Sequence, residues 1–257
     1  MLQDRYRTAG QKDVAYIDES YLAPNAPHAN TGTFYLMTAC VLPATVHEGI
    51  RKDLELIVGK RYWHTTDAQR DPALRPKVNE LCEYIAEGSS EERIIVAAQS
   101  PIDAADQDAE DARARCFEEL LVALAHVVPD IGLVIYEERR TRQQRAIDES
   151  TIKRARKRSQ ATRALQTFAA SPSYENLLWL PDIVSFALYQ HHGRTSWAHY
   201  ATPFAERVQY IHIETKKEAA PECRSKSNQG PPPLSQGEDD GLLHPQSSGL
   251  PTRNTPA

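Results

Sequence analysis

The sequence predicts an α/β domain in which helices cover both faces of a central sheet, and three observations predict it. Short apolar segments of strand character alternate with longer segments in which apolar residues recur at helical spacing. The chain has 257 residues, 40% of them hydrophobic and 25% charged, which suits one globular domain with a tail. No internal repeat of fixed period is present, which argues against a solenoid or a propeller.

Four segments have the composition of buried strands. Each is short and rich in β-branched or aromatic residues, and turn residues or charged residues bound it. The four segments are 13–18 (DVAYID), 33–42 (TFYLMTACVL), 93–98 (RIIVAA) and 132–137 (GLVIYE). The nearly continuous apolar run of 33–42 predicts a strand that is covered on both faces, and 93–98 is a second candidate for a buried strand.

The segments around these strands predict helices, because their apolar residues recur every three or four positions or because they are strongly charged. They are 45–58, 72–86, 106–127 and 139–167. The apolar stretch 176–190 contains Pro181, which is tolerated at the first position of a helix. A helix that begins there would hold Asp182 in its first turn.

The composition changes near residue 218. Pro231, Pro232 and Pro233 stand together, Gly and Ser recur, and no aromatic residue follows. Such a segment cannot bury enough apolar surface to offset the entropy that it would lose on ordering. We therefore expect a folded domain over residues 10–215 and a disordered Pro/Gly/Ser-rich tail over residues 218–257.

Charge and cysteine content limit the classes of function. A formal net charge of −5 means that any binding of a polyanion must be local. The start of the sequence lacks the apolar run of a signal peptide, and no stretch approaches the roughly 20 apolar residues of a membrane span. The four cysteines are scattered without a CxxC pair, which fits a reducing compartment. We expect a cytoplasmic protein with no membrane partner and no structural zinc.

Acidic residues end two of the predicted strands. Asp18 and Glu19 end the first, and Glu137 and Glu138 end the fourth. Sites in α/β sheets form at the carboxyl ends of strands, and a carboxylate at the edge of an apolar core needs a cation or a donor. Mg²⁺ or Mn²⁺, which prefer oxygen ligands, would provide the cation. Strand side chains alternate, so Glu19 should point away from Asp18. Which of Glu137 and Glu138 faces the site stays open.

Each acid also has an ordinary structural role open to it. Asp18 can serve a strand-end turn, and Asp182 can cap its own helix. Glu137 can form a solvated ion pair with one of the two arginines that follow. The IDES run of residues 17–20 recurs at 147–150, where no apolar strand precedes it, so we expect the second copy on a helix surface.

Three short segments carry a resemblance to a known family. They are YIDES at 16–20, YEER at 136–139 and LWLPDIV at 178–184, and YWHTTD at 62–67 is a weaker match. On these segments the chain, over about residues 12–190, resembles the large family catalogued as domain of unknown function 3800. The usual motifs of that family are a YIDESG-like run, an acidic element with Glu and Arg, and an LQLAD-like run before an apolar helix.

The resemblance implies an RNase H-like fold, a mixed sheet flanked by helices, with a two-metal, nuclease-like centre. Its metal-binding and catalytic positions correspond to Asp18, Glu137 and Asp182 in this sequence, with Mg²⁺ or Mn²⁺ as the cofactor. We add Glu19, His64 and Glu138 as accessory candidates; His64 could assist proton transfer or simply be packed beside aromatic residues. The chain departs from the family pattern at Tyr21 (usually Gly), Pro181 (usually a small residue) and Glu137 (usually Asp).

Residues 139–158 contain nine basic residues against two acidic ones. A cationic face after an acidic centre would suit a phosphate backbone through charge attraction and counterion release. Arg154, Arg156 and Lys157 are the candidates for nucleic-acid binding, and a solvated helix is the alternative. The segment lacks interleaved aromatic residues, so sequence-specific reading of bases is not suggested.

These features predict a divalent-metal-dependent nuclease or phosphodiesterase that acts on nucleic acid, DNA or RNA. The alternative is a catalytically weak RNase H-like module that binds nucleic acid or a protein partner without cleavage, which the departures at Pro181 and Glu137 favour. A phosphohydrolase of nucleotides or small molecules is a third hypothesis. The sequence has no Walker-type loop, GxGxxG, HExxH or GxSxG, which argues against the enzyme classes that use them.

Overall fold

The computed structural model describes residues 1–27, 29, 32–89 and 91–215. The predicted tail, 218–257, lies outside these residues. In the described part of the chain, no helix has both the length and the apolar character to cross a membrane.

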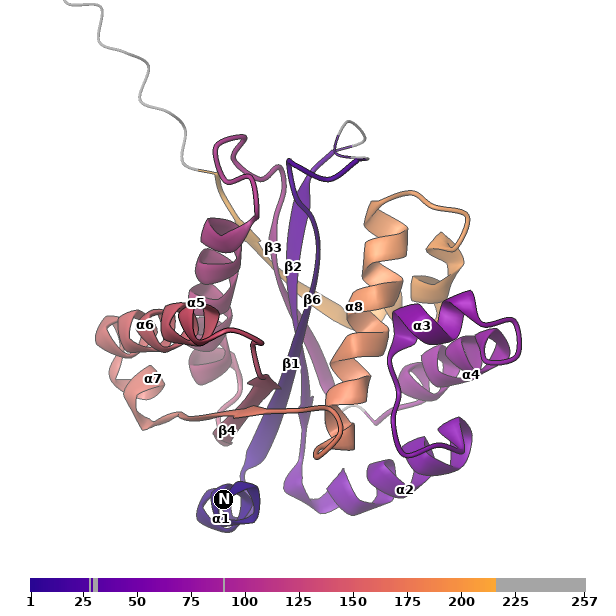
Figure 1. Cartoon of the computed structure of the whole chain (residues 1–257). Helices are drawn as coiled ribbons and strands as arrows, with labels where there is room; N and C mark the ends of the chain where they lie inside the picture. Colours follow the sequence, from indigo (N-terminus) through magenta and orange to yellow (C-terminus); the bar gives the residue numbers. More distant parts are fainter. Residues whose placement is uncertain (28, 30–31, 90, 216–257) are drawn as a thin grey trace, which may run out of the picture. The chain divides into compact units, whose positions relative to one another are not determined.

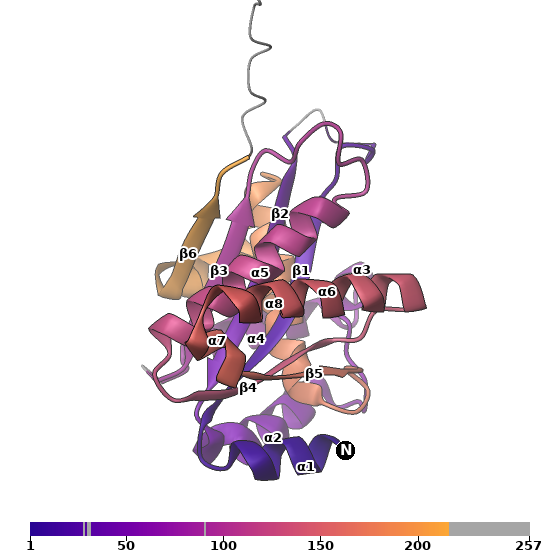
Figure 2. The same ribbon diagram turned by 90° about the vertical axis from the view of Figure 1, so that its left-hand side faces the viewer.

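A six-stranded mixed sheet forms the centre of the fold, in the order β5-β4-β1-β2-β3-β6 (Figures 1 and 2). Its strands are β1 (Asp13–Leu22), β2 (Phe34–Leu42), β3 (Arg93–Gln99), β4 (Ile131–Glu137), β5 (Gln166–Ala170) and β6 (Val208–Ile213). β2 is antiparallel to both β1 and β3, whereas β4 is parallel to β1, β5 to β4 and β6 to β3. The four predicted strands are confirmed, and they are the four inner strands of the sheet.

Helices cover both faces of this sheet, as predicted. One face carries α5 (Glu110–Val127), α6 (Arg142–Arg158) and α7 (Gln160–Ala164), and the other carries α3 (Thr65–Arg70), α4 (Arg75–Ala86) and α8 (Trp179–His192) (Figure 1). α2 (His47–Val58) and α1 (Leu2–Ala9) lie near the end of the sheet where β1 begins (Figure 1). The described residues also form the 3-10 helices η2 (Ala44–Val46), η3 (Asn176–Leu178) and η4 (Ala198–Arg207).

Two sequence expectations about element boundaries are wrong. The helix predicted over 139–167 ends at Arg158, because Ser159 has an extended backbone and caps α7 with its side chain. Thr167 therefore belongs to β5 and not to a helix. The domain also begins before residue 10: α1 contacts β4 and β5, and Tyr6 Oη donates to Glu175 Oε2 at 2.6 Å.

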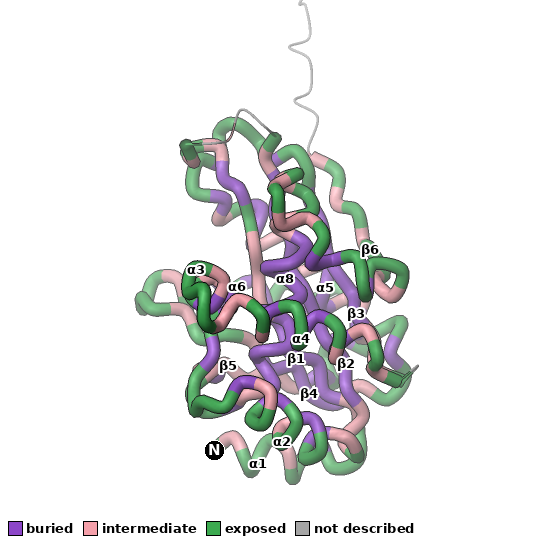
Figure 3. The backbone as a smooth tube through the Cα atoms, turned by 90° about the vertical axis from the view of Figure 1, so that its right-hand side faces the viewer, coloured by how far each residue is buried: buried purple, intermediate pink, exposed green. Residues whose placement is uncertain are grey.

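Alternation along β1 separates two apolar cores, one on each face of the sheet, with the exposed segments outside them (Figure 3). Val14 and Tyr16 belong to the core under α8, whereas Ala15 and Ile17 belong to the core under α5. The same alternation continued along the strand turns Asp18 towards the α8 side.

Candidate functional site

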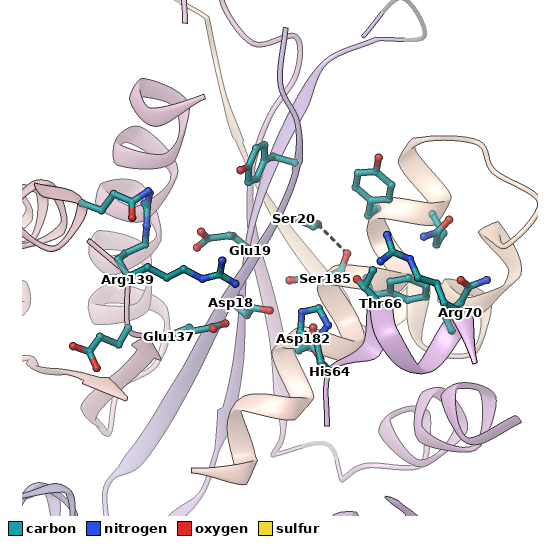
Figure 4. A pocket seen from close by; sticks show the side chains of 18 residues that line it. Asp18, Glu19, Ser20, His64, Thr66, Arg70, Glu137, Arg139, Asp182 and Ser185 are labelled. Atoms are coloured by element: carbon teal, nitrogen blue, oxygen red, sulfur yellow. Dashed lines mark hydrogen bonds between the residues drawn. The ribbon is translucent and has the colours of Figure 1, made fainter. Parts of the chain in front are cut away.

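A cavity of about 750 Å³ opens where β4 ends beside β1 (Figure 4). Side chains from β1, β4, α3, α8, α6 and the segments next to β4 and α3 line it. They include Asp18, Glu19, Ser20, Tyr21, His64, Arg70, Glu137, Glu138, Arg139, Arg140, Asp182 and Ser185. All three predicted metal-binding acids and all three accessory candidates are among them.

Asp18 lies in the middle of β1 and not at its end. The strand continues to Leu22, but its pairing with β4 stops at Ile17, which is opposite Tyr136. Asp18 is thus the first residue of β1 past the paired stretch, and its half-buried carboxylate lies at the edge of the α8-side core. Burial raises the pKa of Asp18 well above its ordinary value, and the negative charges of Asp182 and Glu137 raise it further.

Glu137, and not Glu138, shares the face of Asp18. Leu133 and Ile135 of β4 belong to the α8-side core, so the same alternation turns Glu137 to that side. Burial raises the pKa of Glu137, with further increases from the charges of Glu19 and Asp182. Glu138 points the other way and lies 3.5 Å from Arg145.

The ion-pair alternative for Glu137 is not observed. Arg139 pairs instead with Glu110 of α5. Among the residues that the structure describes, Glu137 forms no ion pair. Its carboxylate is therefore available to a ligand in the cavity.

Asp182 lies in the first turn of α8, as predicted, although the helix begins at Trp179 and not at Pro181. Asp182 does not cap that helix. Its Oδ2 accepts hydrogen bonds from Thr65 N and Thr65 Oγ1, both at 2.8 Å, at the start of α3. Trp63 Nε1 in turn donates to Thr65 Oγ1 at 2.8 Å. Burial raises the pKa of Asp182, and the bonds from Thr65 oppose that rise. One carboxylate oxygen is thus fixed by α3, and the other remains for the cavity.

His64 immediately precedes α3 and lines the cavity with a side chain that is 45% exposed. Its Nδ1 lies 3.3 Å from Asp67 Oδ2, which leaves Nε2 as the nitrogen that Asp67 does not engage. His64 is therefore not packed among the neighbouring aromatic residues, whereas Trp63 beside it is buried.

Glu19 points away from Asp18, as predicted, and forms an ion pair with Arg113 of α5. Arg113 is buried and also binds Asp148 of α6 in a bidentate arrangement, at 3.1 and 3.0 Å, and donates to Tyr35 Oη at 3.2 Å. The expectation that the second IDES copy lies on a helix surface is wrong for Asp148, which is 2% exposed. The sequence reasoning missed Arg113 because its partners lie far from it along the chain.

The cationic residues predicted to bind nucleic acid do not line the acidic cavity. Arg154 pairs with Glu118 of α5 at 2.9 Å, and Arg156 donates to Leu165 O at 3.2 Å. Lys157 is exposed on α6. Three other cations line the cavity instead: Arg70, Arg139 and Arg140.

The donor set of the cavity suits a hard divalent cation. The three acids offer carboxylate oxygens, and the hydroxyl group of Ser185 lies in the same cavity, one turn after Asp182. A second hydroxyl group belongs to Thr38, which pairs with Asp18 on β2 but does not line the cavity. Both hydroxyl oxygens are buried without a hydrogen-bond partner within the described residues. Oxygen ligands of this kind are those that Mg²⁺ and Mn²⁺ prefer.

The acids share this cavity without forming a closed ligand set. Over the ranges that the structure covers, no group of three or more His, Cys, Asp or Glu side chains is arranged to hold a metal ion as it stands. Searches against protein-family models and against curated proteins find no match for this chain. The assignment of function therefore depends on the chemistry of the cavity.

Proposed function

We propose that this chain is a divalent-metal-dependent nuclease or phosphodiesterase that acts on nucleic acid in the cytoplasm. One observation carries the proposal: Asp18, Glu137 and Asp182, from three distant parts of the chain, line one cavity, and burial there raises the pKa of each. Such a cluster of carboxylates is costly without a compensating cation. Perturbed carboxylates that meet in a cavity are typical of functional sites.

The proposal includes an RNase H-like fold and membership of the domain of unknown function 3800 family. The resemblance implies acids on the first strand, on the fourth strand and on a C-terminal helix. The three acids of this cavity come from β1, from β4 and from α8. The order of the inner strands, β3-β2-β1-β4, supports the same proposal, with β2 antiparallel to both of its neighbours and β4 parallel to β1.

In this proposal Asp18, Glu137 and Asp182 hold Mg²⁺ or Mn²⁺. When bound, paired dications activate a water molecule and stabilise the charge on a phosphodiester that is being cleaved. The chain itself contributes the orientation of Asp182 through Thr65 and a proton carrier in His64. Arg70, Arg139 and Arg140 supply positive charge at the wall of the cavity for a polyanionic substrate.

Incubation of the purified chain with single-stranded and double-stranded DNA and RNA, in Mn²⁺ or Mg²⁺, tests the proposal. We expect cleavage products that are absent from parallel reactions with Asp18→Asn and from reactions with EDTA. Cleavage that persists unchanged in Asp18→Asn would reject the proposed centre.

A second candidate function is an RNase H-like module that binds nucleic acid or a protein partner without cutting. The absence of a closed ligand set among the described acids favours it. In the same assay such a module would bind the oligonucleotides without cleaving them, and Asp18→Asn would leave that binding unchanged.

Thr65 provides a separate test of the way in which Asp182 is held. Thr65→Val keeps the shape of the side chain but removes the hydroxyl that donates to Asp182 and accepts from Trp63. Loss of a partner that orients a metal ligand typically costs about 10- to 100-fold in metal affinity or activity. We expect a loss of this size in Mn²⁺ affinity and in cleavage rate. The matched control is Thr65→Ser, which keeps the hydroxyl; an equal loss in both variants would contradict the prediction.

A further inference from the structure

Tyr21 is an exposed aromatic residue at the wall of the acidic cavity. It follows Asp18 by three residues on β1, is 46% exposed, and lies past the point where β1 pairs with β4. Because no β4 residue pairs with this part of β1 in the described structure, side chains from both faces of the strand reach the same cavity. The cavity therefore combines carboxylates and a large aromatic surface.

The ring of Tyr21 is held in a fixed orientation. It stacks on Tyr35 of β2, with ring centroids 5.2 Å apart and an angle of 7° between the planes. Tyr35 is 1% exposed, and its hydroxyl accepts a hydrogen bond from buried Arg113 at 3.2 Å. One face of the Tyr21 ring is thus covered by a rigid partner, and the other face is left for a ligand.

The cations that line the same cavity as Tyr21 indicate the class of that ligand. Arg70 lines the cavity from α3, and Arg139 and Arg140 line it from the segment after β4. Flat aromatic surface beside positive charge suits a nucleic-acid strand, whose bases stack on aromatic rings while its phosphates meet cations. A hydrocarbon ligand would not use the positive charge of Arg70 and Arg140, and a small anion would leave the ring uncovered.

We propose that Tyr21 is a stacking platform for one base of a single-stranded nucleic acid whose adjacent phosphate lies at Asp18, Glu137 and Asp182. This inference rests on the proposed function and narrows its substrate class. The bases of a duplex are already stacked on both faces, so a duplex base must be unstacked before it can lie on Tyr21. The site therefore prefers an unpaired strand to a duplex.

Fluorescence anisotropy with a labelled oligothymidine tests the platform. The measurement uses Ca²⁺ in place of Mg²⁺, and a gel confirms that the recovered oligonucleotide is intact. Alanine substitution of an aromatic residue that stacks on a base lowers affinity about 10- to 100-fold. We expect that loss for Tyr21→Ala and for Tyr21→Leu, which keeps apolar bulk, and near wild-type affinity for Tyr21→Phe. The matched control is Tyr174→Ala, an 87% exposed tyrosine that does not line the cavity.

The probes separate failure of this inference from failure of the proposed function. We expect wild-type protein to bind the single strand more tightly than its duplex, and to lose this advantage with an abasic oligomer. If the wild-type protein cleaves nucleic acid and Tyr21→Ala binds oligothymidine as tightly as wild type does, the platform is overturned and the proposed function is not. Wild-type protein that neither binds nor cleaves any of the probes overturns both proposals.

Discussion

Arg113→Met is expected to lower the free energy of unfolding by about 3–5 kcal/mol, as is usual when one partner of a buried ion pair is removed. Arg113 is 3% exposed and neutralises both Asp148 and Glu19 between α5, α6 and β1. Methionine nearly fills the same volume but leaves Asp148, which is equally buried, without a cation. The cost is therefore that of an uncompensated buried charge, and denaturant unfolding followed by circular dichroism measures it.

The matched control is Arg158→Met. Arg158 also contacts two carboxylates of α5, Glu118 and Glu119, but its side chain is 42% exposed. Exposed ion pairs contribute about 0–1 kcal/mol, so we expect a change within that range. Equal losses of unfolding free energy in the two variants would show that burial does not determine how much the Arg113 ion pairs contribute to stability.

Asp18→Asn is expected to abolish activity and, in the absence of metal, to stabilise the fold. Loss of a residue that only orients a metal ligand typically lowers metal affinity or activity about 10- to 100-fold. Loss of the central ligand should therefore lower the cleavage rate more than about 100-fold. The same substitution removes a desolvated negative charge beside Asp182 and Glu137. We expect the unfolding free energy of the metal-free variant to exceed that of the metal-free wild type at neutral pH. Lower stability of the variant than of wild type in EDTA would contradict this prediction.

The pH dependence of that gain has a definite sign. The pKa of Asp18 is raised in the folded state, so the folded protein takes up a proton that the unfolded chain takes up only near pH 4. The ionised Asp18 carboxylate therefore lowers the unfolding free energy by its full amount when the pH is above the raised pKa. This destabilisation disappears as the pH falls to the ordinary pKa of an aspartate. Burial lowers the pKa of His47 to about 4, so His47 lowers the unfolding free energy as the pH falls. This effect is the same in Asp18→Asn and in wild type, so it cancels from the difference. The difference between Asp18→Asn and wild type should shrink steadily from neutral pH towards pH 4.

The sequence predicts the inner strands of the sheet but not its edges. The four inner strands are covered on both faces and read as continuous apolar runs, such as the wholly buried FYLMTACVL of β2. The edge strands β5 and β6 have the sequences QTFAA and VQYIHI and are mostly half-buried or exposed. They lack the apolar pattern of a buried strand, because only one of their sides pairs with the sheet.

The candidate site divides in a similar way. Asp18 and Asp182 could be predicted as candidates because each stands beside apolar residues, and Glu137 because it ends a predicted strand. The choice of these three acids over Glu19 and Glu138 came from the family resemblance. The face of Glu137 followed only from the register of β4. Thr65 and Arg113 could not be found, since Thr65 meets Asp182 across 117 residues and Arg113 meets Glu19 only once α5 packs on the sheet.

Binding of Mn²⁺ measured by isothermal titration calorimetry is the most direct test of the proposed metal centre. The comparison includes wild type, Asp18→Asn, Glu137→Gln and Asp182→Asn. The control is Glu138→Gln, the first residue after β4, whose carboxylate lies 3.5 Å from Arg145. We expect saturable binding to wild type and Glu138→Gln, and at least about tenfold weaker binding to each of the other three variants. No binding to wild type, or equal binding to Glu137→Gln and Glu138→Gln, would contradict a metal centre built from these three acids.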